Sequence, residues 1–263
     1  MKPIRFIQIS DTHLFKNSSS QICGVDTTAS LKEVLVEIKR NRPTPDFFLL
    51  TGDASQDGTE ESYLKLKRIL HPLNRPVFCL PGNHDHPARM SRLFKNGRVR
   101  FMRDLTWRDW RIILLNSARP PDPGGFLHRR ELERLERTSA GEPQKNILIS
   151  LHHNPVPVKS KWMDRMMVKN NKLFARIIKN RKNLRGVVFG HVHQEYFSKK
   201  NGIPYWGVPS TCVQFRPRIS KMKVDRRPPG FRWFELYPNG RIRSAVVRLK
   251  KFSQKPDYHS KGY

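Results

Sequence analysis

Residues 4–13 read IRFIQISDTH, an apolar run that ends in the metal-seeking side chains Asp11 and His13. Four further apolar runs end in the same way. Their terminal blocks are Gly52-Asp53, Gly82-Asn83-His84-Asp85, His152-His153 and Gly190-His191-Val192-His193. In an open α/β sheet, residues just past the carboxyl ends of the strands converge on one crevice. The five blocks therefore predict a single site for two metal ions, although they lie far apart in the sequence.

The segments between the first three blocks predict a parallel sheet. Strand-like runs cover residues 4–10, 47–51 and 77–80, and two helix-like segments separate them. The first helix is expected over residues 29–40, and the second begins after Thr59 as its N-cap. Strands that alternate with helices in this way pair in parallel through right-handed crossovers.

The rest of the chain continues this alternation and then changes to hairpins. Helices are expected near residues 88–94, 129–137 and 173–180, and strands at 100–103, 111–116, 147–151 and 187–189. Asn201-Gly202 and Asn239-Gly240 each predict a β-hairpin turn. No linker or repeat interrupts the pattern, so we expect one domain over residues 1–249 and a polar basic tail over residues 250–263.

Composition is that of a globular enzyme in a reducing compartment. The chain has 263 residues, enough for one large domain with a buried core, and 37% of them are hydrophobic. Its three cysteines, Cys23, Cys79 and Cys212, form no Cys-x-x-Cys pair, which argues against a disulfide framework and a zinc ribbon. The first strand follows Met1 too closely for a signal peptide, and no apolar run approaches a membrane span. We therefore expect a cytoplasmic protein with no membrane partner.

The net charge is +29, from 51 basic and 22 acidic residues. Such a charge attracts anionic substrates or nucleic acid, but it also results from a general bias toward Lys and Arg on solvated surfaces. Basic residues occur throughout the chain without one dominant block, and no aromatic-spaced repeat suggests a nucleic-acid platform. The sequence therefore favours the surface bias and makes a nucleic-acid partner the less favoured alternative.

The residue types in the five blocks suit a pair of transition-metal ions. Two divalent ions stabilise the attacking and leaving oxygens of a phosphoryl displacement, and they need a carboxylate that bridges them. A mixed set of His and carboxylate ligands favours Fe, Mn, Zn or Co over Ca or Mg, which prefer oxygen. The chemistry predicted for this site is therefore metal-dependent phosphoester hydrolysis.

The blocks resemble those of the calcineurin-like metallophosphoesterase superfamily. Its pattern is Asp-x-His, Gly-Asp, Gly-Asn-His-Asp or Gly-Asn-His-Glu, a later His, then Gly-His-x-His. Within it, the chain is most similar to the bacterial class III 3′,5′-cyclic AMP phosphodiesterases. The stretches that narrow the resemblance are residues 9–15, 51–57, 80–85, 191–195, 209–215 (PSTCVQF) and 229–232 (PGFR). The resemblance implies a layered αββα sandwich of two mixed sheets flanked by helices, with the site at one edge.

The resemblance also implies a role for each residue of the blocks. One ion would be held by Asp11, His13, Asp53 and His193. The second would be held by Asp53, Asn83, His152 and His191, so that Asp53 bridges the pair. Both ions are expected to be Fe or Mn, with Zn or Co as alternatives. His84 would contact the phosphate and assist departure of the 3′ oxygen, and Asp85 would orient His84. The residues expected to contact substrate are His13, Asp53, Asn83, His84 and His193.

Two positions depart from the phosphodiesterase pattern. Asn154 stands before Pro155 where a further His is usual, and the segment after Asp122 matches poorly. His153 neighbours His152, and because adjacent residues of a strand point to opposite faces, only one of the two is expected to bind metal.

The resulting prediction is hydrolysis of cAMP to 5′-AMP at a two-metal site. One alternative is a phosphodiesterase or phosphatase of broader specificity. Another, of a different class, is a basic nucleic-acid-binding protein whose metals serve a nuclease. Specificity is expected to depend on rim loops at residues 21–28, 118–127 and 210–215.

Overall fold

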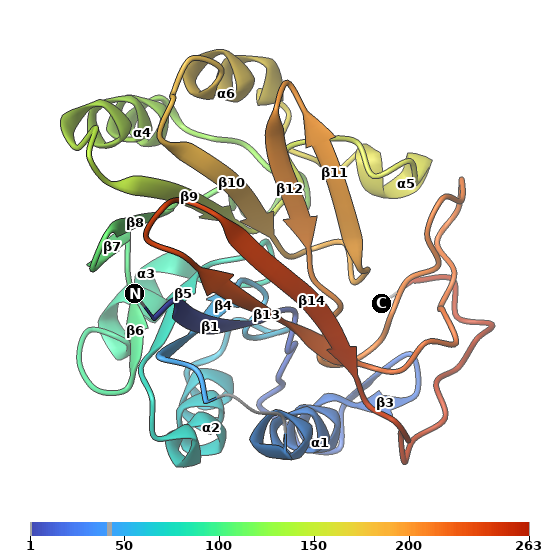
Figure 1. Cartoon of the computed structure of the whole chain (residues 1–263). Helices are drawn as coiled ribbons and strands as arrows, with labels where there is room; N and C mark the ends of the chain where they lie inside the picture. Colours follow the sequence, from blue (N-terminus) through green and yellow to red (C-terminus); the bar gives the residue numbers. More distant parts are fainter. Residues whose placement is uncertain (1, 41–43, 263) are drawn as a thin grey trace.

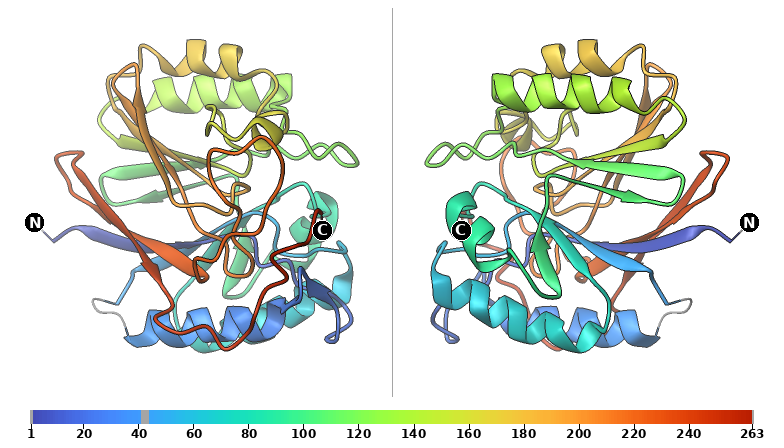
Figure 2. Two further views of the ribbon diagram at one scale, coloured as in Figure 1. Left: turned by 90° about the vertical axis from the view of Figure 1, so that its right-hand side faces the viewer. Right: turned by 90° about the vertical axis from the view of Figure 1, so that its left-hand side faces the viewer.

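The computed structural model describes residues 2–40 and 44–262. Two six-stranded sheets pack face to face, with helices on both outer sides (Figures 1 and 2). The predicted two-sheet sandwich flanked by helices is confirmed. None of the described helices combines the length and the apolar character that a membrane-spanning segment requires.

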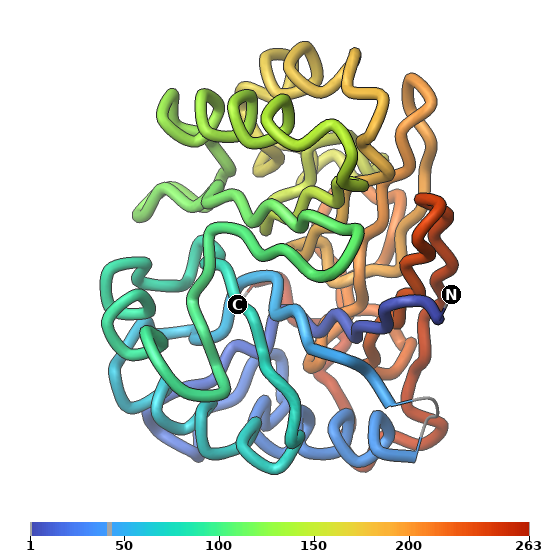
Figure 3. The backbone as a smooth tube through the Cα atoms, turned by 60° about the vertical axis from the view of Figure 1, so that its left-hand side comes forward, coloured from blue at the N-terminus to red at the C-terminus, as the bar shows by residue number. Residues whose placement is uncertain are grey.

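The first sheet is built around the parallel strands predicted from the sequence. Its order is β14 (Ile242–Arg248), β13 (Gly230–Leu236), β1 (Ile4–Ile9), β4 (Phe47–Thr51), β5 (Val77–Leu80) and β6 (Val99–Phe101). Strands β1, β4, β5 and β6 run parallel, and β13 pairs with β1 in the antiparallel sense. The chain therefore places its last hairpin beside its first strand (Figure 3).

Three helices and a short 3-10 turn accompany this sheet. They are α1 (Thr27–Arg40), α2 (Glu60–Leu70), η1 (His71–Leu73) and α3 (Pro87–Leu93). The hydroxyl of Thr59 accepts a hydrogen bond from the Ser62 amide, as the predicted N-cap requires. Buried Leu31, Val34 and Leu66 pack with the apolar side chains of the sheet into one core cluster. This packing holds α1 and α2 against the sheet.

The second sheet repeats the arrangement with a different strand order. The order is β11 (Tyr196–Lys200), β12 (Ile203–Gly207), β10 (Leu184–Phe189), β9 (Asn146–Leu151), β8 (Trp110–Leu114) and β7 (Asp104–Trp107). Strands β8, β9, β10 and β12 are parallel, whereas β7 and β11 are antiparallel edges. Asn201 and Gly202 adopt positive φ in the predicted turn between β11 and β12.

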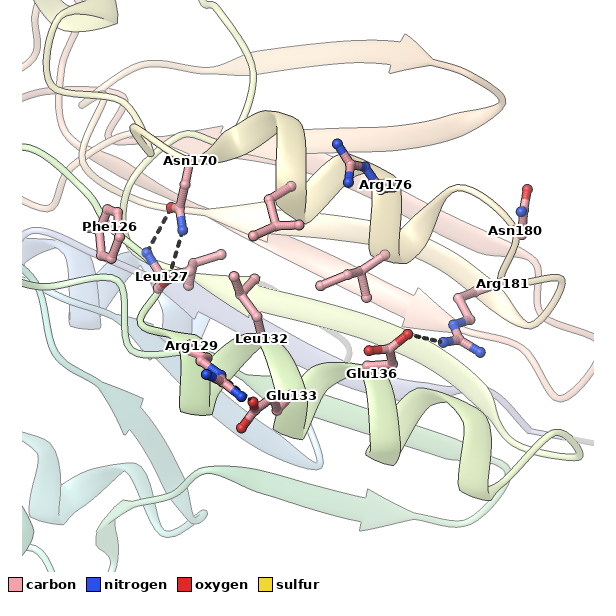
Figure 4. Close-up of a pocket in the computed structure, with 12 residues that line it drawn as sticks. Phe126, Leu127, Arg129, Leu132, Glu133, Glu136, Asn170, Arg176, Asn180 and Arg181 are labelled. Carbon is pink, nitrogen blue, oxygen red and sulfur yellow. Dashed lines mark hydrogen bonds and ion pairs between the residues drawn. The ribbon is translucent and has the colours of Figure 1, made fainter.

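Helices α4 (Arg129–Gly141) and α6 (Asn171–Ile178) cover the outer side of the second sheet (Figure 1). A groove of about 730 Å³ lies between them and is lined by Leu132 and Ile177 among others (Figure 4). The Arg129–Glu133 ion pair lies along this groove. None of the residues predicted to bind metal or substrate lines it.

The core between the sheets consists of large apolar side chains from both. The Phe6 ring stacks on Phe47 at 5.2 Å and on Phe234 at 4.6 Å between ring centroids. Leu148 and Val188 of the second sheet belong to the same cluster. Because both inner faces are apolar, the sheets have a fixed relative position. The carboxyl ends of β1, β4, β5, β9 and β10 thereby meet at one edge.

Four elements differ from the prediction. The strand expected over residues 100–103 is β6, which ends at Phe101, and an unexpected strand, β7, begins at Asp104, because the chain leaves the first sheet there and enters the second. A small hairpin of β2 (Gln21–Ile22) and β3 (Val25–Asp26) lies in an expected loop. A one-turn helix, α5 (Lys161–Asp164), lies in the polar stretch before α6, and α4 continues to Gly141.

Residues 250–262 contain no helix or strand, but they are held along the first half of the chain. The Asp257 amide donates to the Cys23 carbonyl, and the Asp26 amide donates to the Gln254 side chain. Phe252 packs against two of the core clusters. The basic tail thus runs beside the β2–β3 hairpin.

Candidate metal centre

All seven predicted ligands follow strands that end at the shared edge. Asp11 and His13 follow β1, Asp53 follows β4 and Asn83 follows β5, while His152 follows β9 and His191 and His193 follow β10. The potential ligand atoms of Asp11, His13 and His193 lie within 4.8 Å of one another, as do those of Asp11, Asp53 and His152. Asn83 Oδ1 lies 3.2 Å from His152 Nε2. The two sheets therefore contribute to one cluster, which is buried apart from the half-buried Asn83.

Five of these residues adopt left-handed backbone conformations. The φ angles are 56° at Asp11, 45° at His13, 48° at Asp53, 64° at His191 and 47° at His193. Non-glycine residues seldom adopt positive φ, and such conformations cost of order 1 kcal/mol each and concentrate at functional sites. Here they turn the chain sharply at the strand end, so that both residues of a D-x-H or H-x-H block reach the cluster.

Hydrogen bonds fix the orientation of three imidazole rings. Nδ1 of His152 lies 2.8 Å from the Thr51 carbonyl, and Nδ1 of His193 lies 2.8 Å from the Val213 carbonyl. Nδ1 of His13 lies 2.6 Å from Gln56 Oε1. An oxygen acceptor at Nδ1 holds the proton on that nitrogen and leaves Nε2 as the ligand atom. In all three rings, Nε2 is the nitrogen directed toward the cluster.

Several buried polar atoms of the cluster lack hydrogen bonds. No donor or acceptor satisfies Asp11 Oδ2 or either ring nitrogen of His191. Asp53 Oδ2 has no well-formed hydrogen bond and makes only close ion-pair contacts, the nearest at 3.1 Å to His152 Nε2. Buried polar atoms are nearly always paired, so this concentration of unsatisfied ligand-type atoms requires another partner. Divalent transition-metal ions fit both the atoms and the donor types.

Charge in the cluster matches the same interpretation. Burial opposes ionisation of Asp53, but the charges of His152 and His84 hold its pKa well below the ordinary value. Burial lowers the pKa of His13 to about 3 and that of His191 well below its usual range, so both rings are neutral, as metal binding by imidazole requires. Burial also disfavours charge on His152, but the Asp53 carboxylate outweighs it and raises the pKa of His152 to about 9. Metal binding would replace that proton.

The Gly82–Asp85 turn presents His84 beside the cluster. His84 is half-buried, its ring lies edge-on to His13 at 5.1 Å, and its amide donates to Asp53 Oδ1 at 3.0 Å. A side chain in this position, near the ligands but partly open to solvent, is suited to reach a bound phosphate.

The Asp85 carboxylate connects two of the ligand-bearing loops. It accepts hydrogen bonds from the amides of Ala54, Ser55 and Gly82 at 2.9–3.1 Å and from the Tyr63 hydroxyl at 3.1 Å. Burial and the nearby charge of Asp53 raise the pKa of Asp85 to about 7. These bonds hold the turn after β5 against the loop after β4. The predicted orientation of His84 by Asp85 stays a prediction.

His153 lies nearer the cluster than expected. Strand β9 ends at Leu151, so alternation no longer applies to the next two residues, and the inference that they point to opposite faces is wrong. The rings of His152 and His153 are 4.8 Å apart, and both lie near His191. His153 also contacts Ser117 Oγ at 2.9 Å through Nδ1 and the Pro123 carbonyl at 3.2 Å through Nε2.

The sequence analysis did not identify the residues that support the ligands. Gln56 lies within the 51–57 stretch, where nothing in the sequence marks it as a partner of His13. Thr51 and Val213 act through their carbonyl groups, which leave no sequence signal. Phe215 is buried with its ring stacked on His193 at 4.3 Å, and Trp206 packs edge-on against Phe234 between the sheets. Both aromatic side chains therefore serve packing.

Comparisons with known proteins agree with this geometry. The family model described as calcineurin-like phosphoesterase matches residues 4–195. The chain is 34% identical to the 3′,5′-cyclic adenosine monophosphate phosphodiesterase CpdA of Haemophilus influenzae, over 99% of this chain and 95% of that protein. It is 35% identical to the 3′,5′-cyclic-nucleotide phosphodiesterase alr5338 of a Nostoc species, over 94% and 93% of the two chains.

Solved structures share the fold at low sequence identity. A dimetal phosphatase from Danio rerio superposes with a TM-score of 0.64 at 10% identity, covering 94% of this chain and 99% of that one. GAP50 of Plasmodium superposes with a TM-score of 0.65 at 12% identity, covering 97% of this chain and 89% of that one. With the family model covering most of the chain and full-length relatives above 30% identity, the chain belongs to the calcineurin-like phosphoesterase family.

Proposed function

We propose that this protein is a metal-dependent phosphodiesterase that hydrolyses 3′,5′-cyclic nucleotides, with cAMP as its main substrate and 5′-AMP as the product. The observation that carries the proposal is the buried cluster of unsatisfied carboxylate and imidazole atoms at the joint edge of the two sheets. Relatives of nearly the same length, at 34–36% identity, carry the name of cAMP phosphodiesterases. Cyclic-nucleotide turnover in the cell would lower the cAMP signal.

The ligand assignment belongs to the same proposal. Asp11, His13 and His193 would hold one ion, Asn83, His152 and His191 the other, and Asp53 would contact both. We propose Fe or Mn as the metals, with Zn or Co as alternatives. When bound, such an ion pair supplies Lewis-acid catalysis of phosphoryl transfer.

The protein's own side chains would perform the remaining steps. His84 would contact the phosphate and donate a proton to the departing 3′ oxygen. Asp53 Oδ1 accepts a hydrogen bond from the His84 amide, so the carboxylate that would contact the metals also fixes the backbone of the proposed acid. Asp85 would keep the turn carrying His84 at a constant distance from the Asp53 loop. Hydrolysis would then need no covalent nucleophile from the chain. Cys212, which is buried and whose pKa burial raises to about 12, is unsuited to that role.

A broader phosphodiesterase or phosphatase is the second candidate. The observation that favours it is the poorly matched segment after Asp122. There the Lys169 ammonium pairs with Asp122, and the Gly124 amide also donates to that carboxylate. A different rim at this place would admit other esters to the same metals. The third candidate, a basic nuclease, is distinguished by the salt dependence of its binding to polynucleotides.

The test is a substrate panel on enzyme with a measured metal content. Cyclic AMP, cyclic GMP, an aryl phosphodiester, 5′-AMP and single-stranded DNA are compared under the same conditions. We expect cAMP to give 5′-AMP and 5′-AMP itself to react far more slowly. Phosphate release from 5′-AMP at a matching rate would instead identify a phosphatase. No turnover of any cyclic nucleotide by metal-loaded enzyme would refute the proposal.

A further inference from the structure

A second cavity, of about 1180 Å³, lies away from the proposed metal ligands. It is formed by α5 and the residue after it, by residues 216–226 and by residues 258–261 of the tail. The loop that carries residues 216–226 lies on the side of the molecule that faces the viewer in the left panel of Figure 2. We call this second cavity the cationic cavity. No residue of the metal cluster lines it.

Positive charge is concentrated around this cavity. Six basic residues line it: Arg165, Arg216, Lys221, Lys223, Arg226 and Lys261. All six are exposed, and within residues 2–40 and 44–262 none has an acidic partner at ion-pair distance. The one acidic residue of the lining, Asp225, accepts from Arg227 Nε at 2.7 Å. Some cations elsewhere do have acidic partners, as Lys16 has Glu61 and Arg111 has Asp104.

Planar side chains line the same cavity. Tyr258 lies under the Arg226 guanidinium, whose carbon is 5.6 Å from the ring centroid. Trp162 also lines the cavity, and its indole Nε1 is buried without a hydrogen-bond partner. A buried donor that lacks an acceptor is uncommon in proteins. A ligand with anionic oxygens and a planar ring would match the cations and the two aromatic side chains of the cavity together.

The cavity is separate from the substrate site but adjoins its supporting residues. Trp162 contacts the Phe215 ring edge-on at 5.1 Å, and Phe215 stacks on His193. Phe215 is fully buried between them, so a ligand in the cavity does not reach the metal cluster past this ring.

We propose that the cationic cavity is a binding site for a nucleoside polyphosphate, with the Lys and Arg side chains holding the phosphates and Tyr258 and Trp162 holding the base. Its volume of about 1180 Å³ is slightly above the about 300–1,000 Å³ of usual small-molecule sites, so it has room for one such molecule. Proteins that bind single strands use a groove that follows the backbone over several nucleotides. Here the cations converge on one cavity, which favours a compact ligand over a polynucleotide.

The test measures binding of ATP, as the probe, to the metal-loaded protein by titration calorimetry. Inorganic tripolyphosphate and a short single-stranded oligonucleotide serve as comparisons. The titrations are repeated after chelator treatment, because the cavity contains none of the proposed metal ligands and binding there should persist without metal. The unfolding midpoint of each variant checks that it is folded.

The decisive variant reverses two charges of the cavity, Lys221→Glu with Lys223→Glu. Its matched control reverses two exposed lysines of β11, Lys199→Glu with Lys200→Glu, which changes the net charge equally. We expect ATP affinity to fall at least about tenfold in the first protein and to change little in the control, because attraction at short range is replaced by repulsion. Equal losses in both proteins would show that only diffuse surface charge acts, and would overturn the proposal.

A third variant distinguishes recognition of the base from recognition of the phosphates. Tyr258→Ala should weaken ATP binding and leave tripolyphosphate binding unchanged. A wild-type protein that binds tripolyphosphate as tightly as ATP would refute recognition of a nucleoside. Much tighter binding of the oligonucleotide, with a steep salt dependence, would show that the site takes a polynucleotide instead. None of these outcomes depends on cAMP turnover.

Discussion

The Gly82→Ala substitution tests whether the spacing of the two strand ends sets the metal site. A Cβ at position 82 would lie 2.1 Å from Asp53 Oδ1 and 2.5 Å from the backbone nitrogen of Asp53. The first contact is relieved by rotating a side chain, but the second involves main chain. Non-bonded heavy atoms prefer separations of about 3.5 Å, so the turn after β5 and the loop after β4 must separate by about 1 Å.

The cost follows from that displacement. Overpacking a well-packed site costs about 1–3 kcal/mol of unfolding free energy. A shift of about 1 Å between reacting groups reduces turnover by about 10²-fold. Asp53 and Asn83 lie on the two sides of the displaced contact, so metal affinity should also fall. Gly141→Ala is the matched control, since a Cβ there meets nothing within 4 Å at the end of α4.

The assay compares metal content, cAMP turnover at saturating metal and urea unfolding in the two variants. We expect Gly141→Ala to match the wild type or to be slightly more stable, because Ala is the better helix former. Wild-type turnover and full metal content in Gly82→Ala would refute the idea that this contact fixes the site.

Four further predictions concern single side chains. Asp53→Ala should lower occupancy of both metals by elemental analysis, whereas Asn83→Ala should affect mainly one; two full equivalents in Asp53→Ala would remove the bridging role. His84→Ala should keep both metals and lose about 10²–10⁴-fold in cAMP turnover if it is a general acid. Gln56→Ala should weaken metal binding about 10–100-fold by loss of the His13 Nδ1 contact, and Gln56→Glu should restore it in direct metal titrations. Burial of Glu131 opposes its ionisation, but hydrogen bonds and charge from Arg134 and Arg103 lower its pKa below the ordinary 4.5. Ionised Glu131 therefore stabilises the folded protein above pH 4.5, and this stabilisation is lost as the pH falls through the lowered pKa. The difference in urea stability between wild type and Glu131→Gln should shrink as the pH falls below 4.5, and a pH-independent difference would contradict this.

The sequence predicted the parts of the fold that local pattern determines. Apolar runs and caps gave β1, α2 and β5 nearly to the residue, because burial period and capping are properties of neighbouring residues. The Asn-Gly turns likewise gave both hairpins. The end of β6 at Phe101 and the start of β7 at Asp104 were not predictable, since they depend on the sheet that each strand joins.

The candidate site shows the same division. Ligand-type side chains at the ends of apolar runs were evident in the sequence. Their convergence on one site could be predicted because the topology of such a sheet brings these strand ends to one edge. The acceptors at Nδ1 of His152 and His193 are carbonyl groups, which any residue supplies. The cationic cavity was not predicted, because its charges come from three separate segments and are scattered along the chain.

The division of the ligands between two sheets has a consequence for biosynthesis. Asp11, Asp53 and Asn83 come from the first sheet, but His152, His191 and His193 come from the second and emerge much later from the ribosome. The first sheet is itself incomplete until β13 pairs with β1, near the end of the chain. A nascent chain therefore lacks the full ligand set for most of its synthesis. Under the proposed ligand assignment, loading of both metals would be a late event that follows assembly of the two sheets.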